Sequence, residues 1–183
     1  NEVNASKDWN YMDPSAGVDK YVREYVKAFR VFYTAIRSTN ANARVYISLD
    51  HAWTYSNAQD GYYAGKSFLG KFAERMKQEG DVNWGVAMHP YNADMSDSYA
   101  LTATGATDSE MSRYITMRNI DVFTSYMNTE DMLSPSGSCR NILCSEQGYS
   151  SGTSAESQAE QAASIVYAYL KAKNNKDIDG FIL

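Results

Sequence analysis

Apolar residues recur every three or four positions in four separate segments of the chain. The first segment covers 18–38, and the others cover 66–78, 120–132 and 156–173. In each segment this spacing gathers the apolar side chains on one face of an α-helix. Gly80 follows the second segment in the usual position after a helix, and Thr153-Ser154-Ala155-Glu156 fits a capping box before the fourth. The pattern therefore predicts four helices, the first of about five turns.

Four short apolar segments alternate with these helices, near 43–50, 83–89, 140–146 and 178–183. The first alternates apolar and polar residues, as a strand with one buried face does, and the second is a buried strand closed by Pro90. Because the connections are too long for hairpins, the strands must be parallel and joined by right-handed crossovers. The sequence predicts an α/β protein of one domain or part of one, with 94–113 as a functional loop.

The alternation within the strands predicts which way the side chains face. In a parallel barrel the outward side of a strand meets helices, while the inward side turns polar near the carboxyl end, where barrel enzymes keep catalytic residues. In the third strand Ile142, Cys144 and Glu146 share one face, and we expect Glu146 to point inward at the strand's end. In the first strand the outward residues are Val45, Ile47 and Leu49, and the inward ones are Tyr46, Ser48 and Asp50.

Composition narrows the classes of partner. The chain has 183 residues, 44% of them hydrophobic and 21% charged, which is enough for one sizeable core. The formal net charge is −5 and no segment clusters basic residues, so we expect no nucleic-acid partner. Apolar runs are only a few residues long, so we expect no membrane span. The start at Asn1-Glu2 has no initiator Met and no targeting signal, which indicates a piece of a longer polypeptide.

Cysteine and histidine are scarce. The residues Cys139, Cys144, His51 and His89 do not have the paired spacings of a zinc cage, so we expect no metal or other cofactor. A Cys139–Cys144 disulfide would close a very small loop with poor geometry, and the sequence leaves this pairing open. Fifteen tyrosines, many Asn and Ser residues and few cysteines favour an extracellular or cell-surface protein that handles polar ligands.

Two glutamates occupy similar places in this pattern. Glu2 follows Asn1 at the end of a strand that lies mostly outside this chain, and Glu146 ends the third strand. Glycoside hydrolysis needs such a pair, with one carboxyl as proton donor and later base, and the other as nucleophile or as the base for water. With the strand-ending His89-x-Tyr91 between them, the set resembles the clan A retaining glycoside hydrolases, whose (β/α)8 barrel ends strand four with Asn-Glu and strand seven with Glu.

The resemblance implies a role for each residue. Glu2 would be the acid/base, Asn1 would hydrogen-bond the sugar hydroxyl next to the reacting carbon, and Glu146 would be the nucleophile. His89 and Tyr91, on strand six, would steady the nucleophile and the substrate. The chain would then cover the tip of strand four and strands five to eight of one catalytic domain, with the rest of that barrel as its partner.

The same resemblance sets a distance and a charge state for the two glutamates. Retaining enzymes hold their two carboxyls about 5–5.5 Å apart, whereas inverting enzymes hold them about 6.5–9.5 Å apart. Glu146 must be ionised to attack while Glu2 holds a proton, so the two carboxyls need opposite electrostatic environments. The tryptophan platform that usually follows strand eight, and the arginine that strands one to three supply, lie outside this chain.

Further residues are expected to bind the substrate, a β-linked oligo- or polysaccharide. The segments 48–53 and 146–150 look most like a poorly characterised barrel-type group from gut bacteria. Within the first of them we expect Asp50, His51 and Trp53 to contact the sugar. Trp53 follows a strand in a loop, where it offers a surface for stacking, whereas His51 can equally be a structural histidine. Trp84, at the start of a strand, is expected in the core.

Two other functions stay open. Gly148-Tyr149-Ser150-Ser151-Gly152 fits the G-x-S-x-G nucleophile elbow of a serine esterase. That fold needs a histidine downstream of the serine, and none follows position 89; the next helix also begins several residues late. A non-catalytic carbohydrate-binding barrel would keep the aromatic residues and lose the acid function. The presence of both glutamates counts against it.

Overall fold

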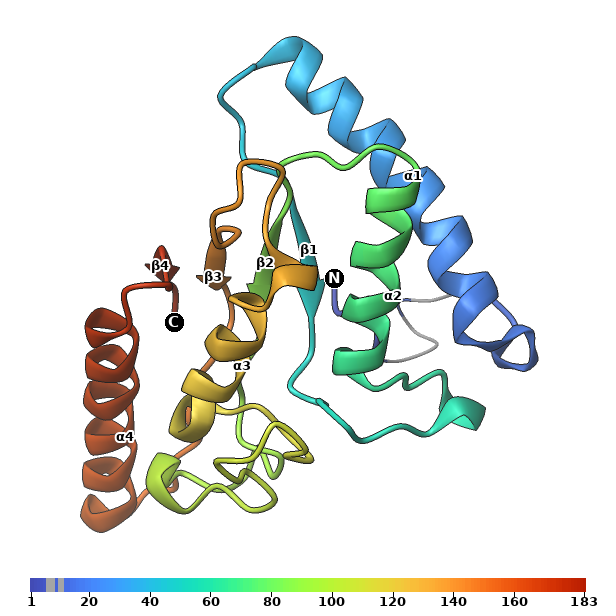
Figure 1. Cartoon of the computed structure of the whole chain (residues 1–183). Coiled ribbons are helices and arrows are strands. Elements are labelled where there is room, and N and C mark those ends of the chain that lie inside the picture. Colours follow the sequence, from blue (N-terminus) through green and yellow to red (C-terminus); the bar gives the residue numbers. More distant parts are fainter. Residues whose placement is uncertain (6–8, 10–11) are drawn as a thin grey trace.

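A sheet of four parallel strands forms the centre of the protein (Figure 1). The computed structural model describes residues 1–5, 9 and 12–183. The strands lie side by side in chain order: β1 (Tyr46–Leu49), β2 (Gly85–Met88), β3 (Ile142–Cys144) and β4 (Gly180–Phe181). Ser48 is level with Ala87, Ala87 with Leu143, and Leu143 with Gly180. The predicted strands and their parallel arrangement are confirmed.

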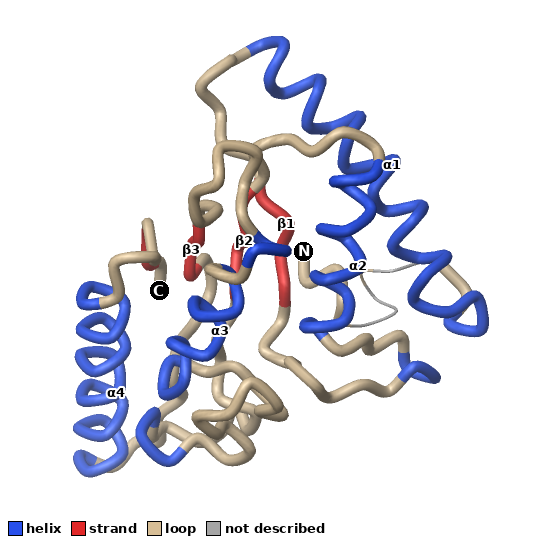
Figure 2. Tube along the Cα trace, in the orientation of Figure 1, coloured by secondary structure: helices blue, strands red, loops and turns tan. Residues whose placement is uncertain are grey.

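Four α-helices accompany the sheet. They are α1 (Gly17–Thr39), α2 (Gly65–Gln78), α3 (Ile120–Met127) and α4 (Ala155–Asn174), and α1 precedes β1 while each of the others connects two successive strands. Figure 2 shows α1 and α2 together near the β1 end of the row of strands and α4 near the β4 end. Short 3-10 helices lie between these elements, at Pro14–Ala16, Ala58–Asp60, Ala100–Thr102, Met117–Asn119 and Glu130–Met132.

Two predicted helix boundaries are wrong, for local reasons. The helix predicted over 120–132 ends at Met127, because the Asn128 side chain donates to the Thr124 carbonyl at 2.8 Å and the Thr129 hydroxyl to the Tyr126 carbonyl at 2.8 Å. The cap of α4 is Ser154, one residue later than the predicted capping box, and its hydroxyl accepts the backbone N–H of Ser157 at 3.1 Å.

The two faces of the sheet differ in burial. One face points toward the helices and carries the buried side chains of Ile47, Leu49, Val86, Met88, Ile142 and Cys144. Tyr46, Ser48 and Leu143 belong to the opposite face and are only half-buried. The predicted faces of the first strand are confirmed. The predicted inward face of Ile142 and Cys144 is wrong, since both are fully buried in the core.

Aromatic side chains pack the core between α1, α2 and the sheet. Phe72 meets Phe29 edge-on at 5.2 Å and Trp84 edge-on at 5.0 Å. Trp84 is 1% exposed, which confirms its predicted place in the core. The guanidinium of Arg140 lies 3.9 Å from the centre of the Trp84 ring and pairs with Asp81, so this buried charge has both a stacking and an ionic partner.

The sheet is open, with β1 and β4 at its two edges. Large apolar side chains are exposed on the flanking helices, at Val31 and Phe32 of α1 and at Val166 and Leu170 of α4. A parallel four-stranded α/β sheet of this kind is compatible with part of a barrel. No helix in the described residues is long and apolar enough to cross a membrane. Cys139 and Cys144 are free thiols.

Candidate active site

Glu2, His89 and Glu146 meet at the carboxyl ends of the strands. The Nδ1 atom of His89 lies 3.0 Å from Oε1 of Glu2, and its Nε2 atom lies 3.6 Å from Oε1 of Glu146. One carboxylate oxygen of each glutamate and one ring nitrogen of His89 all lie within 4.8 Å of one another. The three residues therefore form one cluster, with the imidazole held between two carboxylates.

Glu2 is positioned by the edge of β1. The backbone N–H of Val3 donates to the Ser48 carbonyl at 3.0 Å, and that of Glu2 donates to the Ser48 hydroxyl oxygen at 3.1 Å. Glu2 also adopts a positive φ of 40°, a conformation that side-chain-bearing residues rarely take outside functional sites and tight turns. These bonds hold the segment beside Ser48 of β1, and the turn at Glu2 brings the carboxylate to His89.

Ser48 connects the predicted residues, although the sequence does not single it out as a site residue. Its hydroxyl lies 3.2 Å from the Asn1 side-chain oxygen and 3.1 Å from Nε2 of His89. His89 is 1% exposed, and its backbone N–H donates to the Leu49 carbonyl at 2.9 Å. The signal available from the sequence is the inward place of Ser48 on the first strand, two residues before its predicted end.

Glu146 reaches the cluster from the loop after β3. The backbone N–H of Ser145 donates to the Met88 carbonyl at 3.1 Å, which ties the start of this loop to β2. The chain then bends at Glu146, whose side chain is 46% exposed. Strict alternation would have placed Glu146 on the helix side with Ile142 and Cys144. The bend after the strand, not its parity, brings the carboxylate to His89.

The electrostatics of Glu2 differ from what a resting proton donor needs. The hydrogen bond from His89 lowers the pKa of Glu2, and this effect outweighs the desolvation that raises it. The positive charges that His89 and His51 can carry lower the pKa further. Tyr91 shows the opposite direction: partial burial, followed by the charges of Glu146 and Glu2, raises its pKa, so the phenol keeps its proton.

Asp50 and His51 form a second pair beside this cluster. Nδ1 of His51 lies 3.3 Å from Oδ2 of Asp50, whose other oxygen accepts the backbone N–H of Ala52 at 2.6 Å. Asp50 is 5% exposed, and burial raises its pKa even though the nearby His51 lowers it. The charges of Glu2 and His89 also act on Asp50, so the two pairs share one electrostatic environment.

Comparison of the sequence with models of known protein families assigns the chain to one family. The whole chain, residues 1–183, matches the model of a family of unknown function, DUF5722. The chain belongs to this family. Nothing among the curated proteins matches it.

One solved structure resembles this DUF5722 chain in fold: a family 39 glycoside hydrolase from the gut symbiont Bacteroides cellulosilyticus WH2. The TM-score is 0.52 and the sequence identity 21%, and the match covers 99% of this chain but 31% of the other. The chain thus spans about a third of the length of that hydrolase. At this identity the likeness shows the fold, a parallel α/β sheet compatible with part of a glycoside hydrolase barrel.

Trp53 is wrongly predicted as a sugar-stacking surface in this DUF5722 chain. Its side chain is 1% exposed and meets Phe123 and Tyr126 edge-on at 5.7 and 5.1 Å. Its indole N–H donates to the Glu110 carbonyl at 3.1 Å, so even the polar edge of the ring has a partner inside the protein. Trp53 is a core residue beneath the loops at the carboxyl ends of the strands.

The esterase arrangement has no geometric support. Ser150 is exposed, and among the described residues no hydrogen bond joins its hydroxyl to either histidine. His89 faces Glu2 and Ser48, while His51 pairs with Asp50. Within the described residues, the serine of the G-x-S-x-G match therefore has neither histidine as a hydrogen-bond partner.

Glu2, His89 and Glu146 are also the group of described residues with nitrogen and oxygen atoms close enough to ligate a metal ion. Two carboxylates and one imidazole suit several divalent metals. Both ring nitrogens of His89 already face protein partners, Nδ1 toward Glu2 and Nε2 toward Ser48. A metal ion would have to displace one of these hydrogen bonds.

Proposed function

We propose that the DUF5722 chain carries the two catalytic carboxylates of a retaining glycoside hydrolase that cleaves a β-linked glycan. The observation that carries this proposal is the Glu2–His89–Glu146 cluster at the carboxyl ends of parallel strands. Barrel enzymes place their catalytic residues at this end of the sheet. The likeness in fold to a glycoside hydrolase is consistent with the same chemistry.

The separation of the carboxylates favours retention of configuration. A carboxylate oxygen of Glu2 lies within 4.8 Å of one of Glu146. Retaining enzymes hold the two groups about 5–5.5 Å apart, whereas a separation of about 6.5–9.5 Å leaves room for the water that inverting enzymes use. The short distance between the Glu2 and Glu146 oxygens supports the retaining mechanism that we propose over an inverting one.

In the proposed reaction the half-exposed Glu146 carboxylate attacks the anomeric carbon. Glu2 donates a proton to the leaving oxygen, so the glycosidic bond breaks as the glycosyl-enzyme ester forms. Glu2, now ionised, removes a proton from water, and the resulting attack on the anomeric carbon releases Glu146 and the sugar. Asn1, Asp50, His51 and Tyr91 would bind and orient the sugar around these two groups.

The lowered pKa of Glu2 sets a condition on this mechanism. A group that His89 holds in its ionised form is a ready base for the second step, but it carries the proton needed for the first step only at acidic pH. The proposal therefore includes an acidic pH optimum, with activity falling as pH rises through the pKa of Glu2.

The exposed apolar faces of α1 and α4 fit the same proposal. Val31 and Phe32 on α1, and Val166 and Leu170 on α4, are exposed apolar side chains, and a complete barrel would supply further helices able to cover such faces. We take the rest of the same barrel as the partner that covers them. An extracellular or cell-surface location remains part of the proposal.

The test is a glycan panel with the full-length protein and three variants. Glu146→Gln removes the nucleophile and should lower turnover by at least about 10³-fold. Glu2→Ala should lower turnover by about 10²–10⁴-fold on glycosides whose leaving group needs a proton, and far less on activated aryl glycosides. Azide should then speed the second step of Glu2→Ala by replacing the activated water.

The matched control is Glu156→Gln, at an exposed position in the first turn of α4. It should keep wild-type turnover. Unchanged activity in Glu146→Gln would contradict the nucleophile assignment. Sugar binding without turnover in the wild type would instead favour the non-catalytic carbohydrate-binding barrel.

A further inference from the structure

The segment after β1 is joined to the long loop that precedes α3. The backbone N–H groups of Trp53 and Thr54 donate to the Arg113 carbonyl at 2.9 and 3.3 Å, and that of Ile115 donates to the His51 carbonyl at 2.8 Å. Ala52 and Tyr114 face each other as an antiparallel bridge. These contacts fix the backbone of Arg113 and Tyr114 beside the carboxyl end of β1.

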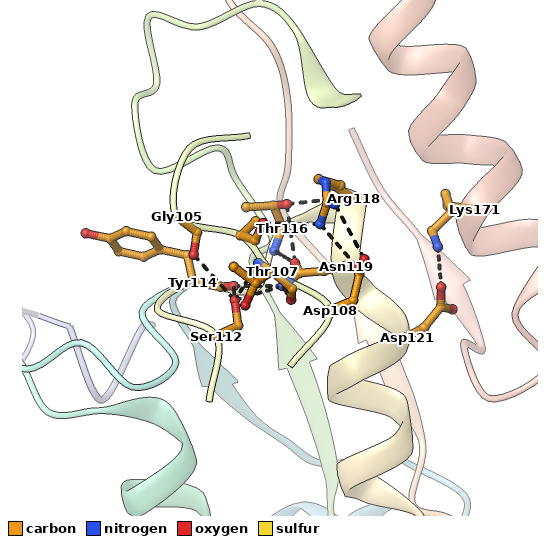
Figure 3. A network of polar contacts seen from close by, with 11 residues as sticks. Gly105, Thr107, Asp108, Ser112, Tyr114, Thr116, Arg118, Asn119, Asp121 and Lys171 are labelled. Atoms are coloured by element: carbon orange, nitrogen blue, oxygen red, sulfur yellow. Dashed lines mark hydrogen bonds and ion pairs between the residues drawn. The ribbon is translucent and has the colours of Figure 1, made fainter. Parts of the chain in front are cut away.

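A buried polar network holds the loop from its other side (Figure 3). The Asn119 amide nitrogen donates to the Thr107 carbonyl at 2.8 Å and to the Tyr114 carbonyl at 3.0 Å, and the Ser112 hydroxyl donates to the Tyr114 carbonyl at 2.7 Å. Asn119 and Ser112 are each 1% exposed. Figure 3 shows the Tyr114 ring directed away from this network. The loop is thus a platform fixed by buried hydrogen bonds, and the Tyr114 ring points away from them.

The platform presents an arginine stacked on two tyrosines. The guanidinium carbon of Arg113 lies 4.6 Å from the ring centre of Tyr55 and 5.4 Å from that of Tyr114, and the two rings are 5.9 Å apart. Arg113 is exposed and both tyrosines are partly exposed. Stacking on rings orients the planar guanidinium and leaves its N–H edges open to a ligand.

Arg113 also lacks the partners that the other arginines have. Within the residues that the structure describes, every other arginine directs its guanidinium to a carboxylate or a backbone carbonyl. In the same loop region Arg118 pairs with Asp108 at 3.1 Å. Among residues 1–5, 9 and 12–183, no carboxylate or backbone carbonyl engages the Arg113 guanidinium. Its charge is therefore oriented by the rings and available to an anion.

This cluster borders the candidate active site. The His51 ring centre lies 5.3 Å from that of Tyr114, and Nδ1 of His51 is 3.3 Å from Asp50. The charge of His51 is among those that lower the pKa of Glu2. The Tyr114 and Tyr55 rings thus connect His51, beside the candidate active site, to the Arg113 guanidinium.

We propose that Tyr55, Arg113 and Tyr114 form a subsite for an anionic sugar residue next to the one that is cleaved, so that the substrate is a glycan bearing carboxylate or sulfate groups. This inference rests on the proposed glycosidase function. The C–H face of a sugar packs on aromatic rings, and a guanidinium fork binds a carboxylate or a sulfate through two parallel hydrogen bonds. A neutral glycan would use the rings and leave the fork unpaired.

The test measures binding by calorimetry, with the full-length protein in its Glu146→Gln form so that no substrate is consumed. The probes are a glucuronate-substituted xylo-oligosaccharide with its carboxyl-reduced form, and a sulfated galacto-oligosaccharide with its desulfated form. At least one acidic probe should bind about tenfold or more tightly than its neutral counterpart. A difference in affinity within the glucuronate pair identifies carboxylate as the recognised group, and a difference within the sulfated pair identifies sulfate.

Three further substitutions are compared in that background. Arg113→Gln should abolish the preference for the acidic probe and change affinity for the neutral one by less than about twofold. Arg113→Lys keeps the charge but not the fork, and should retain only part of the preference. Arg23→Gln, which removes an exposed arginine of α1, should change neither affinity. Thermal unfolding of each variant shows that the fold is kept.

The outcomes separate this inference from the proposed function. Equal binding of acidic and neutral probes, or an acidic preference that survives Arg113→Gln, overturns the subsite. Hydrolysis of acidic and neutral glycans that depends on Glu146, with equal rates for both that Arg113→Gln does not change, leaves the glycosidase and removes the subsite. Binding of acidic glycans that depends on Arg113, in a wild-type protein that hydrolyses none of them, removes the glycosidase and leaves a binding site.

Discussion

The sheet and the long loop hold their parts of the candidate site by different means. His89 is fixed by the strand ladder, through its N–H bond to the Leu49 carbonyl, and Glu2 by the bonds of its segment to Ser48. Arg113 and Tyr114 are held by loop-to-loop backbone bonds above buried polar side chains, chiefly that of Asn119. Backbone hydrogen bonds between strands are kept in most side-chain substitutions. The loop, in contrast, also depends on the side-chain amide of Asn119, which a single substitution removes. Substitutions in the loop should therefore alter substrate preference while leaving the carboxylates in place.

The largest expected effect on stability comes from Trp53, which is buried beneath the loops at the carboxyl ends of the strands. Trp53 packs on α3 and bonds to the Glu110 carbonyl, so Trp53→Ala should lower the free energy of unfolding by about 3–5 kcal/mol. Urea denaturation of the full-length protein measures this loss. Trp9→Ala, at a side chain that is 55% exposed, should stay within about 0.5 kcal/mol of wild type. Unchanged stability together with weaker sugar binding in Trp53→Ala would restore Trp53 as a stacking surface.

The loop is tested separately through Asn119. Asn119→Ala removes the buried amide donor to the Thr107 carbonyl and leaves the Tyr114 carbonyl with the Ser112 hydroxyl alone, and should cost about 1–3 kcal/mol in unfolding free energy. The same variant should lose part of its preference for acidic over neutral oligosaccharides, because Arg113 and Tyr114 are no longer held in place. Asn174→Ala, on the exposed side of α4, is the control for both measurements. A stable Asn119→Ala protein with unchanged selectivity would show that the loop bonds alone orient Arg113.

The smallest expected change is a shift of a pH profile. His89 lowers the pKa of Glu2, chiefly through their hydrogen bond, so His89→Ala should let that pKa rise. A general acid works only while protonated, and activity therefore falls as pH increases through its pKa. The alkaline limb of kcat/KM should move to higher pH in His89→Ala, whatever the loss of rate. A limb that stays in place, or moves to lower pH, would assign the proton donor to another group.

The parts of the fold that repeat can be predicted from the sequence, because burial imposes a period on them. The four strands follow from apolar segments alternating with helical ones, and the faces of β1 follow from Ile47 and Leu49 alternating with Tyr46 and Ser48. The same alternation fails at Glu146, because β3 ends at Cys144 and the chain bends at the glutamate. The alternation of side-chain faces holds only for residues within the paired strand, so it does not predict the direction of residues after Cys144.

The directions of loop side chains cannot be predicted from alternation either, because a loop has no strand pairing that imposes a period. Trp53 and Tyr55 are separated by one residue in one loop, yet the first is buried and the second partly exposed. Which one faces solvent is decided by α3 and by the backbone of Arg113, both distant in sequence. The length and polarity of 94–113 do indicate a functional loop, but the contact of Arg113 with Tyr55 is visible only in the fold.

The most direct test of the account is to trap the covalent intermediate. The full-length protein is incubated with the 2-deoxy-2-fluoro form of the sugar that it hydrolyses, and the labelled peptide is identified by mass spectrometry. Because Glu146 lies with Glu2 and His89 in one cluster, the account predicts a glycosyl ester on Glu146 and release of product with retained anomeric configuration. A label on any other residue, or a product of inverted configuration, would contradict it.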